Sequence, residues 1–171
     1  MATRRKRGLR LWCIRVLRQG LLVLGGPPSR FGTARRPETV FLLMEQTMMS
    51  KHLYRLYGLS ISHFAREVGV NRTYITRALN YYELDFARYV NGYRLQHAIT
   101  LMQGDPQENI SAEEIAQESG FLNERRLKYC FRHTYGISVA VFRKRIRVQS
   151  QAKNFSTALR ASGRAKTATR S

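Results

Sequence analysis

The residues whose types could recognise another molecule gather around two turns of the chain. The first turn contains Gly69 and opens the stretch GVNRTYITRALN, residues 69–80. Arginine and threonine side chains surround an apolar line there, formed by Ile75, Ala78 and Leu79. Arginine can donate two hydrogen bonds to guanine, and threonine can contact the methyl group of thymine. The stretch is therefore either an ordinary solvated helix face or a surface made for a groove of DNA.

Catalytic and metal-binding chemistry has little support in the sequence. The four histidines are scattered, and the two cysteines, Cys13 and Cys130, lie far apart. No set of His, Cys, Asp and Glu has the spacing of metal ligands, and there is no glycine-rich phosphate loop. No nucleophile–base pair or carboxylate dyad is set up either. We expect no enzyme activity, no metal and no cofactor, and the cysteine usage fits a reducing compartment such as the cytoplasm.

The charge of the chain is unusual and unevenly placed. The 171 residues carry a net charge of +19, which predicts attraction to polyanions such as nucleic acid or an anionic membrane surface. Residues 1–36 contain ten Lys and Arg residues, residues 147–171 contain six, and neither segment has an acidic residue. Residues 37–146 hold the other 14 basic residues and all 11 acidic residues, so their net charge is +3. The middle of the chain must therefore be interpreted from its motifs.

The two ends are interpreted as arms outside the folded domain. Residues 1–38 are predicted to be a basic arm, disordered or partly helical, with a GGPP breaker at residues 25–28. The apolar run Leu21–Leu24 is too short for a secretory signal or a membrane span. A basic helix over residues 9–24 could still anchor the chain to a membrane surface. Residues 147–171 have few large apolar side chains and are predicted to be a disordered basic tail.

Residues 39–146 are predicted to be all-α. Apolar residues recur there at intervals of three and four, and no alternating strand pattern persists. The expected helices cover residues 39–56, a short segment before Gly69, 72–82, 86–103, 111 to about 120, 124–135 and a last segment with Val141, Phe142 and Ile146. Several helix N-termini have a side chain suited to cap free amides, namely Ser60 or Ser62, Asn71, Ser111 with Glu114, and Asn123.

One helical sequence motif occurs twice. The sequences ISHFAREVGVNRTYITRAL, residues 61–79, and AEEIAQESGFLNERRLKYCF, residues 112–131, each have an apolar residue and Ala, then three residues, then Gly and another apolar residue. The small Ala allows close helix packing, and the Gly can adopt the left-handed backbone of a tight turn. This pattern is typical of a helix-turn-helix motif, whose second helix enters the major groove. Two copies about fifty residues apart, joined by a long helix, are more specific than one.

The double motif resembles the DNA-binding domain of the AraC/XylS family of bacterial transcription regulators. The resemblance covers about residues 50–146 and is carried by AREVGVNRTYITRALN, FARYVNGYRLQHAITLM, EEIAQESGF, FRHTYGIS and FRKRI. The stretches NRTYITRALN and FARYVNGYR look most like variants common in the Bacteroidetes lineage. The resemblance implies a homeodomain-like fold of two helix-turn-helix subdomains joined by a long linker helix. Both recognition helices would enter successive major grooves about 34 Å apart.

The resemblance also implies roles for individual side chains. The first recognition helix would present Thr73, Thr76 and Arg77 to base edges, and the second would present Glu124, Arg125 and Tyr129. Phosphate contacts are implied for the helix starts and the nearby basic residues, namely Asn71, Asn123, Arg72, Arg126, Lys128 and Arg132. Arg94, on the long helix, is expected to brace the two units.

The sequence departs from the family pattern at three places. Val139 follows Ser138 where the family usually has proline, Leu127 replaces a common aromatic residue, and Tyr129 stands where an arginine often makes contacts. The last difference implies an unusual base preference. About fifty residues precede the first motif, which is too short for a ligand-sensing domain, so no small-molecule ligand is expected.

The expected partner is double-stranded DNA, with RNA polymerase as a further candidate. Two other interpretations stay open at this stage. The chain could bind polyanions without sequence preference through its basic arms, or it could be a membrane-associated regulator anchored by residues 9–24. Removing the arms separates these interpretations, because only a sequence-reading middle would retain its preference among DNA sequences.

Overall fold

The computed structural model of the chain describes the backbone of residues 36–168 and the side chains of residues 36–155. This part of the chain is entirely helical, which confirms the predicted all-α fold. The elements are α2 (Pro37–Lys51), the short 3₁₀ helix η1 (Leu53–Arg55), α3 (Ile61–Val68), α4 (Arg72–Tyr81), α5 (Phe86–Gly104), α6 (Ala112–Glu118), α7 (Glu124–Tyr135) and α8 (Val139–Ala168). The predictions for residues 1–35 lie outside the described residues.

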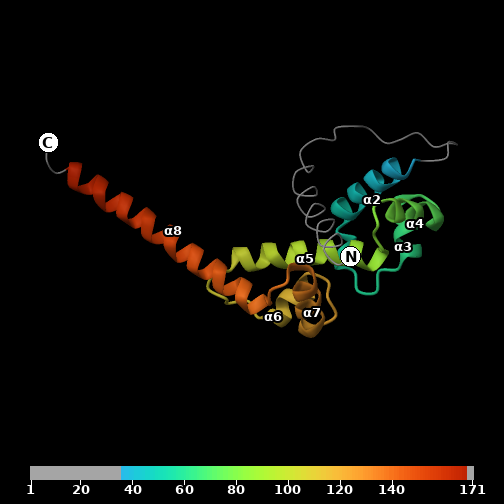
Figure 1. Ribbon diagram of the computed structural model, residues 1–171. Helices are drawn as coiled ribbons and strands as arrows, with labels where there is room; N and C mark the ends of the chain where they lie inside the picture. The colour runs from blue at the N-terminus through green and yellow to red at the C-terminus, as the bar shows by residue number, and fades with distance from the viewer. Residues whose placement is uncertain (1–35, 169–171) are drawn as a thin grey trace.

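Two helical units share the long helix α5 (Figure 1). The first unit consists of α2, α3, α4 and the N-terminal half of α5, and its core includes Met44, Phe64, Ile75 and Tyr89. The second unit consists of α6, α7, the C-terminal half of α5 and the start of α8. α5 therefore belongs to both cores, as expected of a helix that joins two motifs.

Helix α2 is an integral part of the first unit. It buries Val40, Met44 and Met48, and its main neighbour in the fold is α4. The resemblance noted from the sequence begins only near residue 50, yet the core of the first unit needs α2. A chain that starts at residue 50 would expose the inner side of α4, so we expect it to be unstable.

The predicted N-terminal caps form in the structure. The hydroxyl of Ser60 accepts a hydrogen bond from the His63 amide at 3.1 Å. Ser111 and Glu114 form a complete capping box, in which each side chain accepts a hydrogen bond from the other residue's amide. Such caps satisfy amides that have no partner inside the helix. This local chemistry is why the positions of the helix starts could be predicted.

One predicted helix boundary was wrong. The expected helix over residues 39–56 is interrupted at His52, whose φ of 49° turns the chain into η1. This turn buries Leu53 and Tyr54 and leaves Leu56 exposed. The last helix contains Val141, Phe142 and Ile146 as predicted; Phe142 and Ile146 pack against the second core, and Val141 is exposed.

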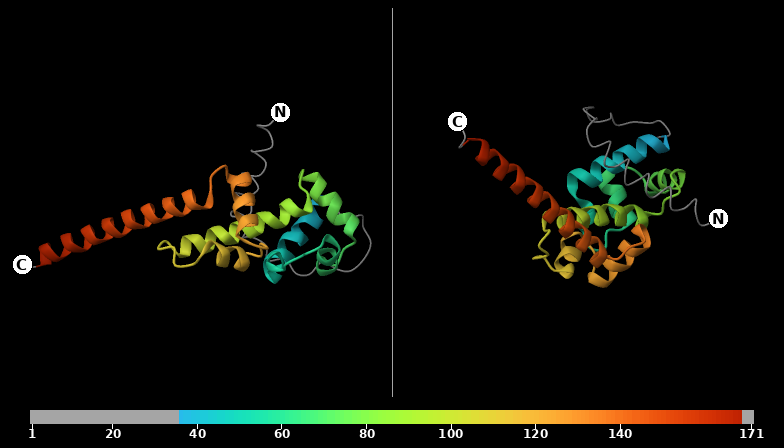
Figure 2. Two further views of the ribbon diagram at one scale, coloured as in Figure 1. Left: turned by 90° about the horizontal axis from the view of Figure 1, so that it is seen from below. Right: turned by 60° about the vertical axis from the view of Figure 1, so that its left-hand side comes forward.

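The structure differs from the predicted disordered tail. α8 continues without interruption to Ala168 and projects away from the second unit, on the side opposite the first unit (Figures 1 and 2). Composition alone indicated disorder, because this segment has no apolar stripe for a core. Its first two turns are packed, however, and a helix that has already formed extends at low cost through Gln, Ala, Lys and Arg.

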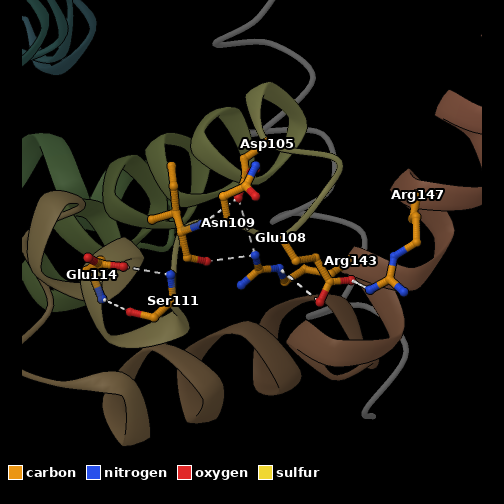
Figure 3. A network of polar contacts seen from close by, with 8 residues as sticks. Asp105, Glu108, Asn109, Ser111, Glu114, Arg143 and Arg147 are labelled. Atoms are coloured by element: carbon orange, nitrogen blue, oxygen red, sulfur yellow. Dashed lines mark hydrogen bonds and ion pairs between the residues drawn. The ribbon is translucent and has the colours of Figure 1, made fainter.

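A polar network fixes the base of α8 to the α5–α6 connection (Figure 3). Arg143 is buried, and its guanidinium donates a hydrogen bond to the Ile110 carbonyl at 2.7 Å. The same guanidinium lies 3.6 Å from a carboxylate oxygen of Asp105 and 3.8 Å from one of Glu108. Arg147, one turn later, pairs with Glu108 at the surface. These contacts set the direction in which α8 leaves the second unit.

Candidate nucleic-acid interface

The first candidate surface lies on α4. Its inner side is formed by Ile75, Ala78 and Leu79, which are at most 2% exposed. Its outer side carries the residues that the sequence singled out, namely Arg72, Thr73, Thr76 and Arg77, all of them exposed. Core packing on one side therefore holds these polar side chains toward solvent on the other.

The N-terminus of α4 is capped locally. The side-chain oxygen of Asn71 accepts a hydrogen bond from the Thr73 amide at 3.0 Å, and the Thr76 hydroxyl donates to the Arg72 carbonyl at 3.2 Å. The exposed end of α4 carries no acidic residue. The partial positive charge of a helix N-terminus favours an anion such as phosphate.

The second candidate surface lies on α7. Leu127, Cys130 and Phe131 form its buried side, and burial raises the pKa of the Cys130 thiol. The outer side presents the remaining residues that the sequence singled out: Arg125, Arg126, Lys128, Tyr129 and Arg132 are exposed, and Asn123 and Glu124 are half-buried. The two sets thus occupy corresponding helices, but in different units of the fold.

The N-terminus of α7 differs from that of α4 because it is surrounded by acidic groups. Asn123 caps the Arg126 amide at 2.9 Å, as its type predicted. In addition, a carboxylate oxygen of Glu113, from α6, accepts a hydrogen bond from the Glu124 amide at 2.8 Å. The Glu124 carboxylate pairs with Lys128 one turn later. Sequence reasoning missed Glu113; its place two residues before Ile115 in the first helix of the motif is the signal that could have indicated it.

Aromatic contacts organise the exposed side of α7. The guanidinium carbon of Arg126 lies 5.7 Å from the ring centroid of Tyr129, and that ring stacks on His133 at 6.1 Å. Both contacts are on the solvent side of the helix. Tyr129 is therefore held over the outer surface of α7, at the position where the family resemblance implies a base contact.

The two turns have the same backbone structure. Gly69 and Gly120 have φ values of 74° and 85°, which is the left-handed region that favours glycine. After each glycine, the next amide donates to the carbonyl of the motif's alanine, from Val70 to Ala65 at 3.1 Å and from Phe121 to Ala116 at 2.8 Å. The repeated sequence pattern therefore corresponds to a repeated helix-turn-helix geometry.

Arg94 braces the two units, as expected. Its Nε donates to the Tyr54 carbonyl at 2.7 Å, and a terminal nitrogen donates to the Leu56 carbonyl at 2.9 Å. Its guanidinium carbon also lies 6.0 Å from the ring centroid of Phe121, at the second turn. Loss of solvation lowers the pKa of Arg94, and two carbonyl acceptors stabilise the charge.

Comparison with known proteins agrees with this geometry. Residues 64–145, from the middle of α3 to the first turns of α8, match the family described as the helix-turn-helix domain. This segment is an AraC-type helix-turn-helix domain. The match omits α2, although α2 completes the core of the first unit of the AraC-type domain.

A solved structure with a similar fold is the crystal structure of a DNA-binding transcriptional dual regulator from Escherichia coli K-12. It is 15% identical, the TM-score is 0.53, and the similarity covers 68% of this chain and 97% of that chain. At this level of identity the likeness shows the fold alone. No curated protein matches the chain.

Two other kinds of site, a metal centre and a membrane span, are absent from residues 36–168. Among these described residues, no group of three or more His, Cys, Asp and Glu side chains is placed to hold a metal ion. No helix in this part of the chain is long and apolar enough to cross a membrane.

Proposed function

We propose that this chain is a transcription regulator that binds double-stranded DNA with sequence preference, inserting α4 and α7 into successive major grooves. The observation that carries the proposal is the repeated geometry of the two motifs. Each has a glycine turn, a capped second helix, a buried apolar side and an exposed polar side. A helix presented in this way fits the width of the major groove.

Base contacts are proposed for the outer residues of each helix. Thr73, Thr76 and Arg77 would read bases from α4, with Arg77 suited to guanine. Arg125, Glu124 and Tyr129 would do so from α7. Glu124 pairs with Lys128 through one carboxylate oxygen, and its other oxygen can accept a hydrogen bond from a cytosine.

Phosphate contacts are proposed for the residues at the margins of the two helices. Arg72 and the N-terminus of α4 would hold the backbone on one side, together with Asn71. The second motif would use Asn123, Arg126, Lys128 and Arg132. These contacts supply affinity that depends on salt, whereas the base contacts supply preference among sequences.

Regulation of transcription places the protein in the cytoplasm and makes RNA polymerase a second proposed partner. We propose neither a catalytic activity nor a small-molecule ligand. Whether the chain activates or represses depends on where its site lies relative to a promoter.

Selection of bound sequences from random duplex DNA by the full chain, repeated across a salt series, tests the proposal. We expect two short conserved blocks about one helical turn apart. Arg77→Ala should reduce the sequence conservation within one block, and Arg125→Ala should reduce it within the other. Arg66→Ala, at an exposed position on α3, should leave the conservation of both blocks unchanged. Binding without any enrichment, which only weakens as salt rises, would refute sequence-preferring recognition.

Binding without any enrichment of sequences would favour a polyanion binder acting through its basic ends. One observation supports this alternative: α8 contains eight Lys and Arg residues and no acidic residue, and its outer part is exposed at residues 151–155. Deleting residues 1–36 and 147–171 together would then abolish binding, whereas the regulator would lose affinity and keep its preferred sequence.

A further inference from the structure

The two units of the AraC-type domain have separate cores connected through α5. Tyr89 and Tyr93, near the start of α5, belong to the first core, and Leu95 and Ala98, further along, belong to the second. Long helices curve gently, so a single helical connection would leave the two units some freedom to tilt relative to each other. Any second connection between them therefore determines the angle between α4 and α7.

Such a second connection exists at residues 53–56. Leu53 and Tyr54 are buried in the first core, while the main chain of Tyr54 and Arg55 lies against Gly120 in the second motif's turn. A Cβ atom at Gly120 would lie 2.5 Å from the Tyr54 carbonyl oxygen and 2.8 Å from the Arg55 Cα. We call this contact the 53–56 joint. Its two backbones approach more closely than any side chain at position 120 would allow.

Side chains of the second unit and of α5 fasten the 53–56 joint. Arg94 donates to two carbonyls of the joint, those of Tyr54 and Leu56, at 2.7 and 2.9 Å. Arg55 pairs with Glu118 of α6 at 2.5 Å. That ion pair is about half exposed and adds little stability. Both bonds from Arg94 are charge-assisted, and the one to the Tyr54 carbonyl is also partly shielded from solvent.

The corresponding glycine of the first motif has no such contact. Gly69 has nearly the same left-handed backbone as Gly120, but a Cβ atom there would have no atom within 4 Å. Both turns need glycine for their conformation, yet only Gly120 also needs it for a contact between the units. Substitution of Gly69 therefore tests the conformation of the turn alone, whereas substitution of Gly120 also tests the contact between the units.

We propose that the 53–56 joint fixes the angle between α4 and α7 and thereby sets the spacing of the two DNA blocks that the chain accepts. Gly120 and Arg94 are its positioning residues. The proposal rests on the proposed function. One inserted base pair rotates the second block by about 34° and moves it by about 3.4 Å along the duplex. A fixed pair of helices cannot follow this change, whereas a loosely connected pair can.

A measurement on the protein alone tests whether the joint holds the units together. Spin labels at Arg66→Cys on α3 and Gln117→Cys on α6 report the distance between the units. They are placed in a full-length Cys13→Ser chain, where the one remaining native thiol, Cys130, is buried. We expect one narrow distance distribution, broadened by Gly120→Ala and unchanged by Gly69→Ala, which imposes the same left-handed strain without the contact.

A second pair of variants keeps the test valid if Gly120→Ala does not fold. Arg94→Met removes the two bonds to the joint and retains an unbranched apolar side chain. Its control is Arg88→Met on the same helix, where the ion pair seen among the described residues is with Asp85, at 3.9 Å. Distance distributions of Gly120→Ala and Arg94→Met that are as narrow as that of the parent chain would overturn the proposal.

Binding to a series of duplexes with zero, one or two base pairs inserted between the selected blocks tests the consequence for DNA. For the parent chain we expect a loss of about 100-fold per insertion, comparable to one severe mismatch in a specific site. Gly120→Ala and Arg94→Met should reduce this loss to about 10-fold, while the controls keep it. Unchanged spacing profiles would also overturn the proposal. If the parent chain selects no sequence, the proposed function is refuted. The distances between the spin labels would still test whether the 53–56 joint holds the two units at a fixed angle.

Discussion

The Arg143 network offers a quantitative test of how α8 is attached. We consider Arg143→Met, which keeps an unbranched side chain of similar reach but removes the guanidinium. The substitution leaves the Ile110 carbonyl without its 2.7 Å donor and removes the cation beside Asp105 and Glu108. Arg143 is only 8% exposed, so water reaches its side chain poorly in the folded state.

The magnitude follows from the bonds that are lost. A hydrogen bond from a charged donor to a shielded carbonyl contributes about 1.5–3 kcal/mol. The two ion-pair distances of 3.6 and 3.8 Å are longer than hydrogen bonds, so we add little for them. We expect Arg143→Met to lower the free energy of unfolding by about 2–3 kcal/mol. Arg147→Met, which breaks a half-exposed pair with Glu108, should lower it by less than about 1 kcal/mol.

Urea unfolding followed by circular dichroism measures both values, and hydrogen exchange locates the change. In Arg143→Met, amides in the first turns of α8 should exchange faster, while those of α3 and α4 should be unaffected unless the whole domain unfolds. Equal effects of the two substitutions would refute the reasoning, because burial would then not distinguish Arg143 from Arg147. Loss of stability without faster exchange in α8 would refute the role of the network as the anchor of that helix.

Two further predictions concern acidic side chains. Glu113→Gln retains an oxygen that can accept a hydrogen bond from the Glu124 amide, but it removes a negative charge from the N-terminus of α7. We therefore expect the DNA affinity at low salt to rise about two- to five-fold. An unchanged or weaker affinity in a binding titration would contradict this prediction. Burial raises the pKa of Glu45 above its usual value, while a hydrogen bond from Tyr93 opposes this shift. The folded state therefore retains a proton that the unfolded state releases, so this contribution to stability is complete below about pH 4.5 and is lost as the pH rises through the folded pKa. Glu45→Gln should flatten the decline in stability between pH 4.5 and 7, and an identical decline in both chains, measured by unfolding at each pH, would show that another group is responsible.

Much of the candidate interface could be predicted because its signals are local. Glycine turns, capping side chains and three-to-four apolar spacing depend on neighbours within one or two turns of the chain. The exposed sides of α4 and α7 followed from locating Ile75 and Leu127 on the inner sides. Glu113 was missed because its bond to the Glu124 amide depends on how α6 crosses α7, which spacing alone does not encode.

The errors at the ends of helices have a common physical origin. His52 adopts a left-handed backbone in a stretch whose periodicity favours continued helix, because the turn lets Leu53 and Tyr54 enter the core. α8 continues where composition indicated disorder, because its first turns are anchored by Arg143 and Arg147. At His52, contacts distant in sequence outweighed the local preference, whereas in α8 they anchor a helix that local propensity then extends.

The sequence by itself determined the class of fold, the two repeated motifs and the side chains that each recognition helix exposes, since these depend on local hydrogen bonds and on helical periodicity. Only the tertiary structure decided how the two motifs are held together. The Arg94 bonds reach residues 40 and 38 positions earlier in the chain. The packing of α2 on α4 and the contact of Gly120 with Tyr54 and Arg55 likewise join segments that are distant in the sequence. Their geometry results from the simultaneous packing of two cores against one helix, and no local pattern specifies it.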